Sequence, residues 1–299
     1  MAHVVEIEDL VKRYGATEAV RGVSLIVAEG ETYGYLGPNG SGKTTTIRCL
    51  LGLLHPTSGS VRVFGLDVGR DRGSILERVG HIPGEFGLWP QMTGRECLEY
   101  LGSLHPRKPV RLKELCERLE LEDADLDRQM RFYSRGMRQK IAIVQAFQHD
   151  PELVILDEPT EGLDPVMKER FMTLVREQRA RGGTTFLSSH ILSEVEECAD
   201  RVAVLRTGRV VKEAPTEELA ENRVRHCTVT FKQPVTDLSV LEVAGVARLR
   251  GDSRVVHFDY QGDMHALIDR LSDLGVEDFL AEPASLREAF FAVYEEEQA

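Results

Sequence analysis

A glycine-rich segment of the chain contains residue types that bind phosphate. It reads Gly-Pro-Asn-Gly-Ser-Gly-Lys-Thr from Gly37 to Thr44 and fits the pattern G-x-x-x-x-G-K-[ST] without a mismatch. Gly37, Gly40 and Gly42 allow positive φ, so that successive backbone N–H groups can point at one set of phosphate oxygens. Lys43 then reaches the β- and γ-phosphates, and the Thr44 hydroxyl is placed to bind Mg²⁺. The segment predicts a nucleoside triphosphate site.

The residues on either side support this interpretation. Thr32 to Leu36 is an apolar run that predicts a buried strand, and Thr45 to Leu51 is expected to form a helix. The partial positive charge at the start of that helix also points at the phosphates. The residues expected to contact nucleotide here are Gly37, Pro38, Asn39, Gly40, Ser41, Gly42, Lys43, Thr44 and Thr45.

Two adjacent acids follow a second apolar run, Leu153 to Leu156. Asp157 is predicted to hold Mg²⁺, and Glu158 to orient and polarise the attacking water as general base. Two acids after a strand also occur in many helix caps. The preceding phosphate loop makes the catalytic interpretation the stronger one.

A further candidate lies at Tyr133-Ser-Arg-Gly-Met137, which opens an amphipathic helix. A serine in this position is usually an N-cap. The same geometry makes an anion site, because free N–H groups, the Ser134 hydroxyl and the helix dipole face one point.

The elements that must position these residues indicate an α/β fold. Short Val/Ile/Leu-rich runs alternate with amphipathic stretches from Val4 to Ala214, and the first half of this span looks more antiparallel. Residues 92–148 have helical periodicity and are expected to form a helical insert. Pro165 suits the first position of a helix, with Asp164 as its cap. The remaining expected strands are Val4 to Val11, Gly22 to Val27, Val61 to Phe64, Thr184 to Leu187 and Val202 to Leu205, and the helices are Pro165 to Arg181 and Ile191 to Cys198.

A different pattern begins after residue 222. We expect one domain at residues 1–222 and a small α/β domain, regulatory or dimerising, at residues 223–299. The alternative is a packing appendage with an acidic end. Its expected strands are Cys227 to Phe231 and Val255 to Phe258, and its expected helices are Met264 to Leu274 and Ser285 to Tyr294.

Composition restricts the partners. The formal net charge of −12 argues against wide contact with nucleic acid or anionic lipid. No run approaches the ~20 apolar residues that span a bilayer, and the N-terminus lacks a signal-peptide pattern. The five cysteines are scattered without a C-x-x-C pair, which predicts reduced, structural thiols.

The chain resembles the nucleotide-binding subunit of an ATP-binding cassette (ABC) transporter. Six motifs occur in that family's order: Tyr14, Gly37 to Thr44, Tyr133 to Met137, Asp157-Glu158, Gly162-Leu-Asp-Pro165 and His190. The resemblance covers roughly residues 4–220. It implies a P-loop NTPase cassette, with a mixed sheet flanked by helices and a helical insert, followed by the small C-terminal domain.

The resemblance also implies roles for single residues. Tyr14 looks like the aromatic that stacks on adenine, and His190 like the switch histidine that contacts the γ-phosphate. Ser134 and Gly136 look like the pair that contacts ATP held by an opposite subunit. Asp164 looks like the residue that crosses between subunits. A head-to-tail dimer, most simply a homodimer, is therefore part of the expected active site.

Two positions depart from the family pattern. The signature reads Tyr-Ser-Arg-Gly-Met instead of Leu-Ser-Gly-Gly-Gln, a variant that resembles exporters of drugs, antibiotics, sodium or lipids. Gly84 stands where the family places a glutamine that helps bind Mg²⁺. Glu85 from the next position, or Gln91 from further on, could substitute. The C-terminal segment Pro283 to Tyr294 is similar to the extension of daunorubicin-resistance and sodium-export ATPases.

The resemblance implies the ATPase subunit of an ABC exporter, with ATP and Mg²⁺ as ligands and Lys43, Glu158 and His190 in catalysis. It implies a second copy of the cassette and an integral membrane permease as partners, no nucleic acid, and a location on the cytoplasmic face of the membrane. One alternative is a soluble ABC ATPase that remodels a nucleic-acid or ribosomal complex. Another is a nucleotide-gated binding module with little turnover.

Overall fold

The chain folds as two compact units, residues 1–216 and 217–299. The computed structural model describes residues 2–84, 87, 89–221, 224–235, 241, 243–272 and 274–283. The expected boundary after residue 222 lies six residues further along than this division, just past helix α9 (Thr216–Glu221). Each unit is described separately below.

A six-stranded sheet forms the centre of the first unit. Its order is β10-β9-β3-β8-β7-β6, and all neighbours are parallel except β10 and β9. Its strands are β3 (Thr32–Leu36), β6 (Val79–Ile82), β7 (Leu153–Asp157), β8 (Thr184–Ser189), β9 (Arg201–Arg206) and β10 (Arg209–Pro215). Every residue of β3, β7 and β8 is buried, as expected for parallel strands covered on both faces. The carboxyl ends of these three strands lie side by side, because Leu36 pairs with Ser189 and Asp157 with Ser188.

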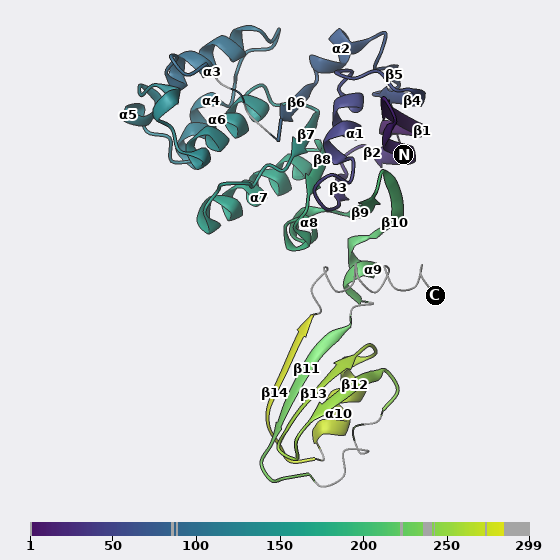
Figure 1. The fold of residues 1–299 in the computed structure, drawn as a ribbon. Helices are drawn as coiled ribbons and strands as arrows, with labels where there is room; N and C mark the ends of the chain where they lie inside the picture. The colour runs from purple at the N-terminus through teal and green to yellow at the C-terminus, as the bar shows by residue number, and fades with distance from the viewer. Residues whose placement is uncertain are drawn as a thin grey trace. The chain divides into compact units, whose positions relative to one another are not determined.

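A smaller antiparallel sheet confirms the antiparallel first half. Its order is β2-β1-β4-β5, with β1 (His3–Tyr14), β2 (Thr17–Ala28), β4 (Ser58–Val63) and β5 (Leu66–Asp67). Helix α1 (Lys43–Leu50) lies between the two sheets (Figure 1), and one apolar core joins all three. That packing places the start of α1 at the carboxyl end of β3.

The helical insert is also confirmed. It comprises α3 (Gly94–Ser103), α4 (Leu112–Arg118), α5 (Asp123–Leu126), a 3₁₀ turn (Met130–Phe132) and α6 (Arg135–Phe147). Figure 1 shows these helices grouped away from β1 and β4. The remaining helices of the unit are α2 (Arg72–Leu76), α7 (Pro165–Ala180) and α8 (Leu192–Cys198).

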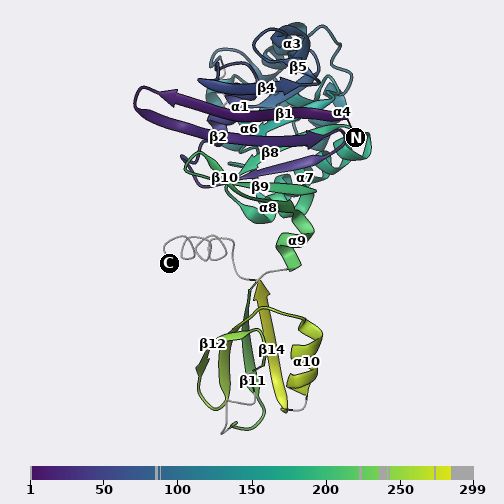
Figure 2. The same ribbon diagram turned by 90° about the vertical axis from the view of Figure 1, so that its right-hand side faces the viewer.

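The second unit contains a four-stranded antiparallel sheet and helix α10, and it begins within helix α9 (Figure 2). The order is β12-β13-β11-β14, with β11 (Arg225–Phe231), β12 (Val246–Gly251), β13 (Val255–Tyr260), β14 (Val276–Pro283) and α10 (Met264–Ser272). Leu267 and Leu271 of α10 join Cys227, Val229 and Phe231 of β11 in a separate core. The expected helix Ser285 to Tyr294 lies outside the described residues.

Some expectations on element bounds were wrong. The strand expected to end at Phe64 ends at Val63, because Phe64 has a positive φ of 54°. The strands β5, β6, β10, β12 and β14 were not predicted. β6 contains Gly80, where an added Cβ would lie 2.0 Å from the Ala146 carbonyl oxygen of α6. The tertiary packing therefore requires a residue that weakens the strand pattern.

The cysteines and the lengths of the helices bear on two further expectations. Each of the five cysteines is free and buried. In the described part of the chain, no helix combines the length and apolar character needed to cross a membrane.

Candidate phosphate-binding site

The glycine-rich segment forms a turn between β3 and α1. Gly40 and Gly42 adopt positive φ values of 79° and 111°, and an added Cβ on Gly42 would lie 2.5 Å from the Ala19 carbonyl oxygen. Lys43, the first residue of α1, is only 6% exposed. Its Nζ donates to the Gly37 carbonyl oxygen at 2.6 Å. The loop thus bends back over the lysine.

Two features show that the loop fits a phosphate chain. The hydroxyl of Ser41 is buried, yet it has no hydrogen-bond partner among the described residues. Such a group costs about 1–3 kcal/mol when it stays unpaired. An added Cβ on Gly40 would meet no atom within 4 Å, so that this side of the loop is open. An anion rich in oxygen would satisfy the hydroxyl and occupy the open side.

Asp157, the last residue of β7, is 2% exposed. Its Oδ1 accepts a hydrogen bond from the Ser188 hydroxyl at 2.7 Å. Its Oδ2 faces Gly84, where an added Cβ would lie 3.3 Å away. Oδ2 and the Thr44 hydroxyl are hard oxygen donors of the kind Mg²⁺ prefers. Thr44 and Asp157 therefore offer the donor types that would hold a magnesium ion.

Glu158 joins the phosphate loop to the end of β8. Its Oε1 lies 3.0 Å from Lys43 Nζ, and its Oε2 lies 2.7 Å from Nδ1 of His190. Its φ is 51°, an uncommon value for a non-glycine residue, and its amide donates to the Ser188 carbonyl oxygen at 3.2 Å. The three residues expected to act in catalysis are therefore in direct contact.

The start of α6 is packed against the loop that follows Glu158. Ser134 caps the helix by accepting from the Met137 amide at 3.2 Å, as predicted. An added Cβ on Gly136 would lie 2.7 Å from the Gly162 carbonyl oxygen. No hydrogen bond or ion pair within the described residues joins Ser134 to Lys43. Ser134 and Gly136 are thus outside the Lys43 cluster of their own chain.

Asp164 caps α7, as the sequence predicts. Its Oδ1 accepts from the Met167 amide at 3.0 Å, and this bond holds the pKa of the Asp164 carboxyl below its usual range. Tyr14, at the end of β1, is 46% exposed, and Lys12 Nζ lies 5.5 Å from its ring centroid. Glu85 lies outside the described residues, and Gln91 is exposed.

Sequence reasoning missed Ser188. This buried residue supports both acids, through its hydroxyl to Asp157 and its carbonyl oxygen to the Glu158 amide. The signal in the sequence that could have identified Ser188 was a pair of serines at the end of an otherwise apolar run.

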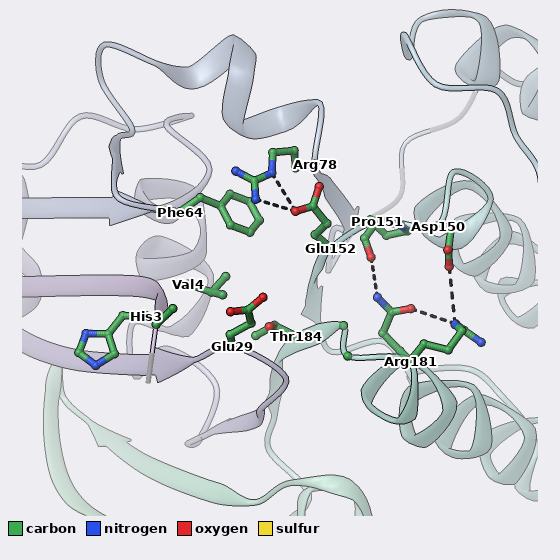
Figure 3. Close-up of a pocket in the computed structure, with 14 residues that line it drawn as sticks. His3, Val4, Glu29, Phe64, Arg78, Asp150, Pro151, Glu152, Arg181 and Thr184 are labelled. Carbon is green, nitrogen blue, oxygen red and sulfur yellow. Dashed lines mark hydrogen bonds and ion pairs between the residues drawn. The ribbon is translucent and has the colours of Figure 1, made fainter.

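A cavity of about 350 Å³ lies at the amino ends of β7 and β8 (Figure 3). None of the predicted site residues lines it. Arg78 stacks on Phe64, with its guanidinium carbon 3.6 Å from the ring centroid, and pairs with Glu152. This pairing lowers the pKa of Glu152 to about 2. The charges of Arg78 and Glu152 neutralise one another. The cavity is separate from the phosphate loop.

A second hollow, of about 410 Å³, lies between the central sheet and the helical insert. Leu76 of α2 and Leu101 of α3 contribute apolar walls, together with Leu104. His149 also lines it, and burial and the nearby His105 lower the pKa of His149. The exposed Trp89 packs edge-on against Tyr100 of α3, with ring centroids 5.2 Å apart.

Comparisons with known proteins agree with this geometry. Residues 20–161 match the family model described as ABC transporter. The chain is 37% identical over 231 residues to a bacitracin transport ATP-binding protein of Bacillus licheniformis, covering 76% of this chain and 74% of that one. It is 35% identical over 294 residues to a daunorubicin resistance ATP-binding protein of Streptomyces coeruleorubidus, covering 95% and 92%.

A solved structure shares the fold of the first unit. It is the dimeric structure of a post-hydrolysis state of an ATP-binding cassette bound to ADP and phosphate. The two chains are 25% identical with a TM-score of 0.65, over 71% of this chain and 98% of the other. This match therefore spans a cassette and not the whole chain.

Proposed function

Because the chain belongs to the ABC transporter family, as one of its ATP-hydrolysing subunits, we propose that it powers export of a drug, antibiotic, ion or lipid-like substrate through a separate membrane permease. The contact of Lys43, Glu158 and His190 beside the phosphate loop carries this proposal. The names of the two relatives, which concern bacitracin transport and daunorubicin resistance, support the exporter type.

The reaction is ATP + H₂O → ADP + phosphate. Lys43 binds the phosphate chain, and Glu158 accepts a proton from the attacking water, an effect worth ~10²–10⁴-fold in rate. His190, bonded to Glu158, orients that carboxylate and contacts the γ-phosphate. Thr44 and Asp157 would hold Mg²⁺, which neutralises charge on the phosphates when bound.

A second copy of the cassette completes each site. No hydrogen bond or ion pair among the described residues joins Ser134 or Gly136 to Lys43 of their own chain, which agrees with a role at the ATP of an opposite subunit. The dimeric cassette bound to ADP and phosphate supports a second copy of the cassette. The head-to-tail arrangement is part of the proposal. Tyr14 would stack on the adenine, and Asp164 would cross to the other subunit.

The permease is expected to dock at the hollow between the central sheet and the helical insert. Its apolar walls suit a protein segment, and so do Trp89 and Tyr100, which are exposed and pack against each other. This partner would place the chain on the cytoplasmic face of the membrane.

Replacing Glu158 by Gln tests the reaction. The substitution should reduce steady-state phosphate release by at least ~100-fold and leave ATP binding intact, because it removes the base and keeps the shape. Glu152→Gln, at the other end of β7, is the matched control and should retain the wild-type rate. Hydrolysis by Glu158→Gln at the original rate would contradict the base assignment.

Affinity purification of the Glu158→Gln protein from native cells tests the partner. In ATP and mild detergent, we expect a polytopic membrane protein to co-purify, identified by mass spectrometry. The net charge of −12 disfavours nucleic-acid partners. Recovery of only ribosomal or DNA-bound partners would replace the exporter with the soluble alternative.

A further inference from the structure

Helix α8 contains a buried carboxylate that the proposed reaction does not use. Glu194 is 8% exposed and accepts three hydrogen bonds. Its Oε2 accepts from the hydroxyls of Thr160 at 2.7 Å and Ser189 at 3.0 Å, and its Oε1 accepts from Lys168 Nζ at 2.9 Å. Both carboxylate oxygens are therefore paired with donors from outside α8.

Two of these donors are sequence neighbours of the catalytic residues. Thr160 lies two positions after Glu158, and Ser189 directly precedes His190. The Ser189 carbonyl oxygen also accepts from the Gly37 amide at 3.2 Å. A continuous set of bonds thus connects the phosphate loop, through Ser189 and Glu194, to the loop that follows Glu158.

The third donor connects Glu194 to α7. The Lys168 amide donates to the Asp164 carbonyl oxygen at 2.9 Å, in the first turn of that helix. Asp164 is the residue proposed to cross to the opposite subunit. Glu194 therefore contacts the loop after β7 through Thr160, helix α7 through Lys168, and the last residue of β8, Ser189.

We propose that Glu194 is a positioning residue that holds His190 and the loop Pro159–Leu163 in one arrangement, so that Glu158 and His190 act on the same water. This inference rests on the proposed function. A role in stability alone would explain the geometry less well, because buried ion pairs contribute little net stability. Every side-chain donor comes from a segment adjoining the site.

The test is a double-substitution cycle in the full-length chain. Glu194→Gln and Thr160→Val should each lower kcat about tenfold with KM for ATP unchanged, since small misplacements of catalytic groups cost up to ~100-fold. The double variant should be no slower than the slower single variant, because residues that act as a unit are non-additive. Glu197→Gln, also on α8 but exposed and paired with Arg176, should keep the wild-type kcat.

Two results would overturn the inference: wild-type kcat in both single variants, or losses that multiply in the double variant. A kcat loss that only tracks a lower unfolding temperature would also overturn it. If Glu194→Gln does not fold, Thr160→Val and Ser189→Ala decide the question, and wild-type kcat in both overturns the inference. Absence of ATP turnover in the wild-type chain would instead refute the proposed function.

Discussion

Lys43 and Glu158 form an ion pair beside the phosphate loop. Their side chains are 6% and 16% exposed, and the two charged atoms lie 3.0 Å apart. Breaking a buried pair is costly unless each partner finds a replacement. The pair therefore joins the two groups that are proposed to bind the phosphate chain and to act as the base.

A substitution at Gly84 tests how the site binds Mg²⁺. Its Cβ position faces Asp157 Oδ2 at 3.3 Å, so a longer side chain would extend toward the proposed magnesium ligands. We expect Gly84→Gln to lower the Mg²⁺ concentration for half-maximal hydrolysis severalfold, because it adds an oxygen ligand. A magnesium titration of phosphate release measures this.

Gly87 supplies the control for that substitution. An added Cβ there would meet no atom within 4 Å. Gly87→Gln should leave the magnesium dependence unchanged. Equal shifts in both variants would mean that the loop, and not the residue facing Asp157, controls metal binding.

At the scale of elements, substitutions at two helix caps distinguish an effect on stability from an effect on ATP hydrolysis. Ser134 caps α6, and Thr93 caps α3 with a complete capping box. Replacing either by Ala should lower the free energy of unfolding by about 1 kcal/mol. Only Ser134→Ala should also reduce ATP hydrolysis, because only Ser134 is proposed to contact phosphate.

Denaturant unfolding and phosphate release, measured side by side, check this prediction. Thr93→Ala is the matched control, since it loses the same kind of bond in the same domain. A similar loss of activity in both variants would show that Ser134 is simply a cap. Unchanged activity in both would remove Ser134 from the site.

The elements themselves were predictable where one face or both faces are apolar. β3, β7 and β8 are buried along their whole length, and each contains apolar residues that mark it in the sequence, such as Leu153 to Leu156 in β7. β6 was missed because Gly80 is required by the close approach of α6. β12 was missed because none of its residues is fully buried and it includes Arg248 with a positive φ.

At the scale of the whole molecule, each unit has its own core. All predicted site residues that the structure describes lie within residues 1–216, and the α10 core belongs to the second unit alone. We therefore expect a chain ending at Glu221 to fold and to bind an ATP analogue with a Kd within about twofold of the full chain. Equilibrium binding and thermal unfolding check this.

The full chain should show two unfolding transitions and the shorter chain one, because separate cores unfold separately. Lys43→Ala is the control in both lengths and should abolish binding in each. If the shorter chain aggregates or loses binding with Lys43 intact, the second unit is needed for the site.

The sequence by itself determined the chemistry of this protein. The residue order from Gly37 to Thr44, the acids Asp157 and Glu158, and the helix caps Ser134 and Asp164 depend on local spacing and local backbone needs. Such features are written in consecutive residues, and the structure bears out both caps.

Only the tertiary structure decided which residues meet. The contacts of Glu158 with Lys43 and His190 join positions far apart in the chain, because parallel strands bring their carboxyl ends to one edge of a sheet. Glu194 has no local signal at all: an acid in a short helix normally faces water. Its burial and its three donors exist only because α7, α8 and the ends of two strands pack together.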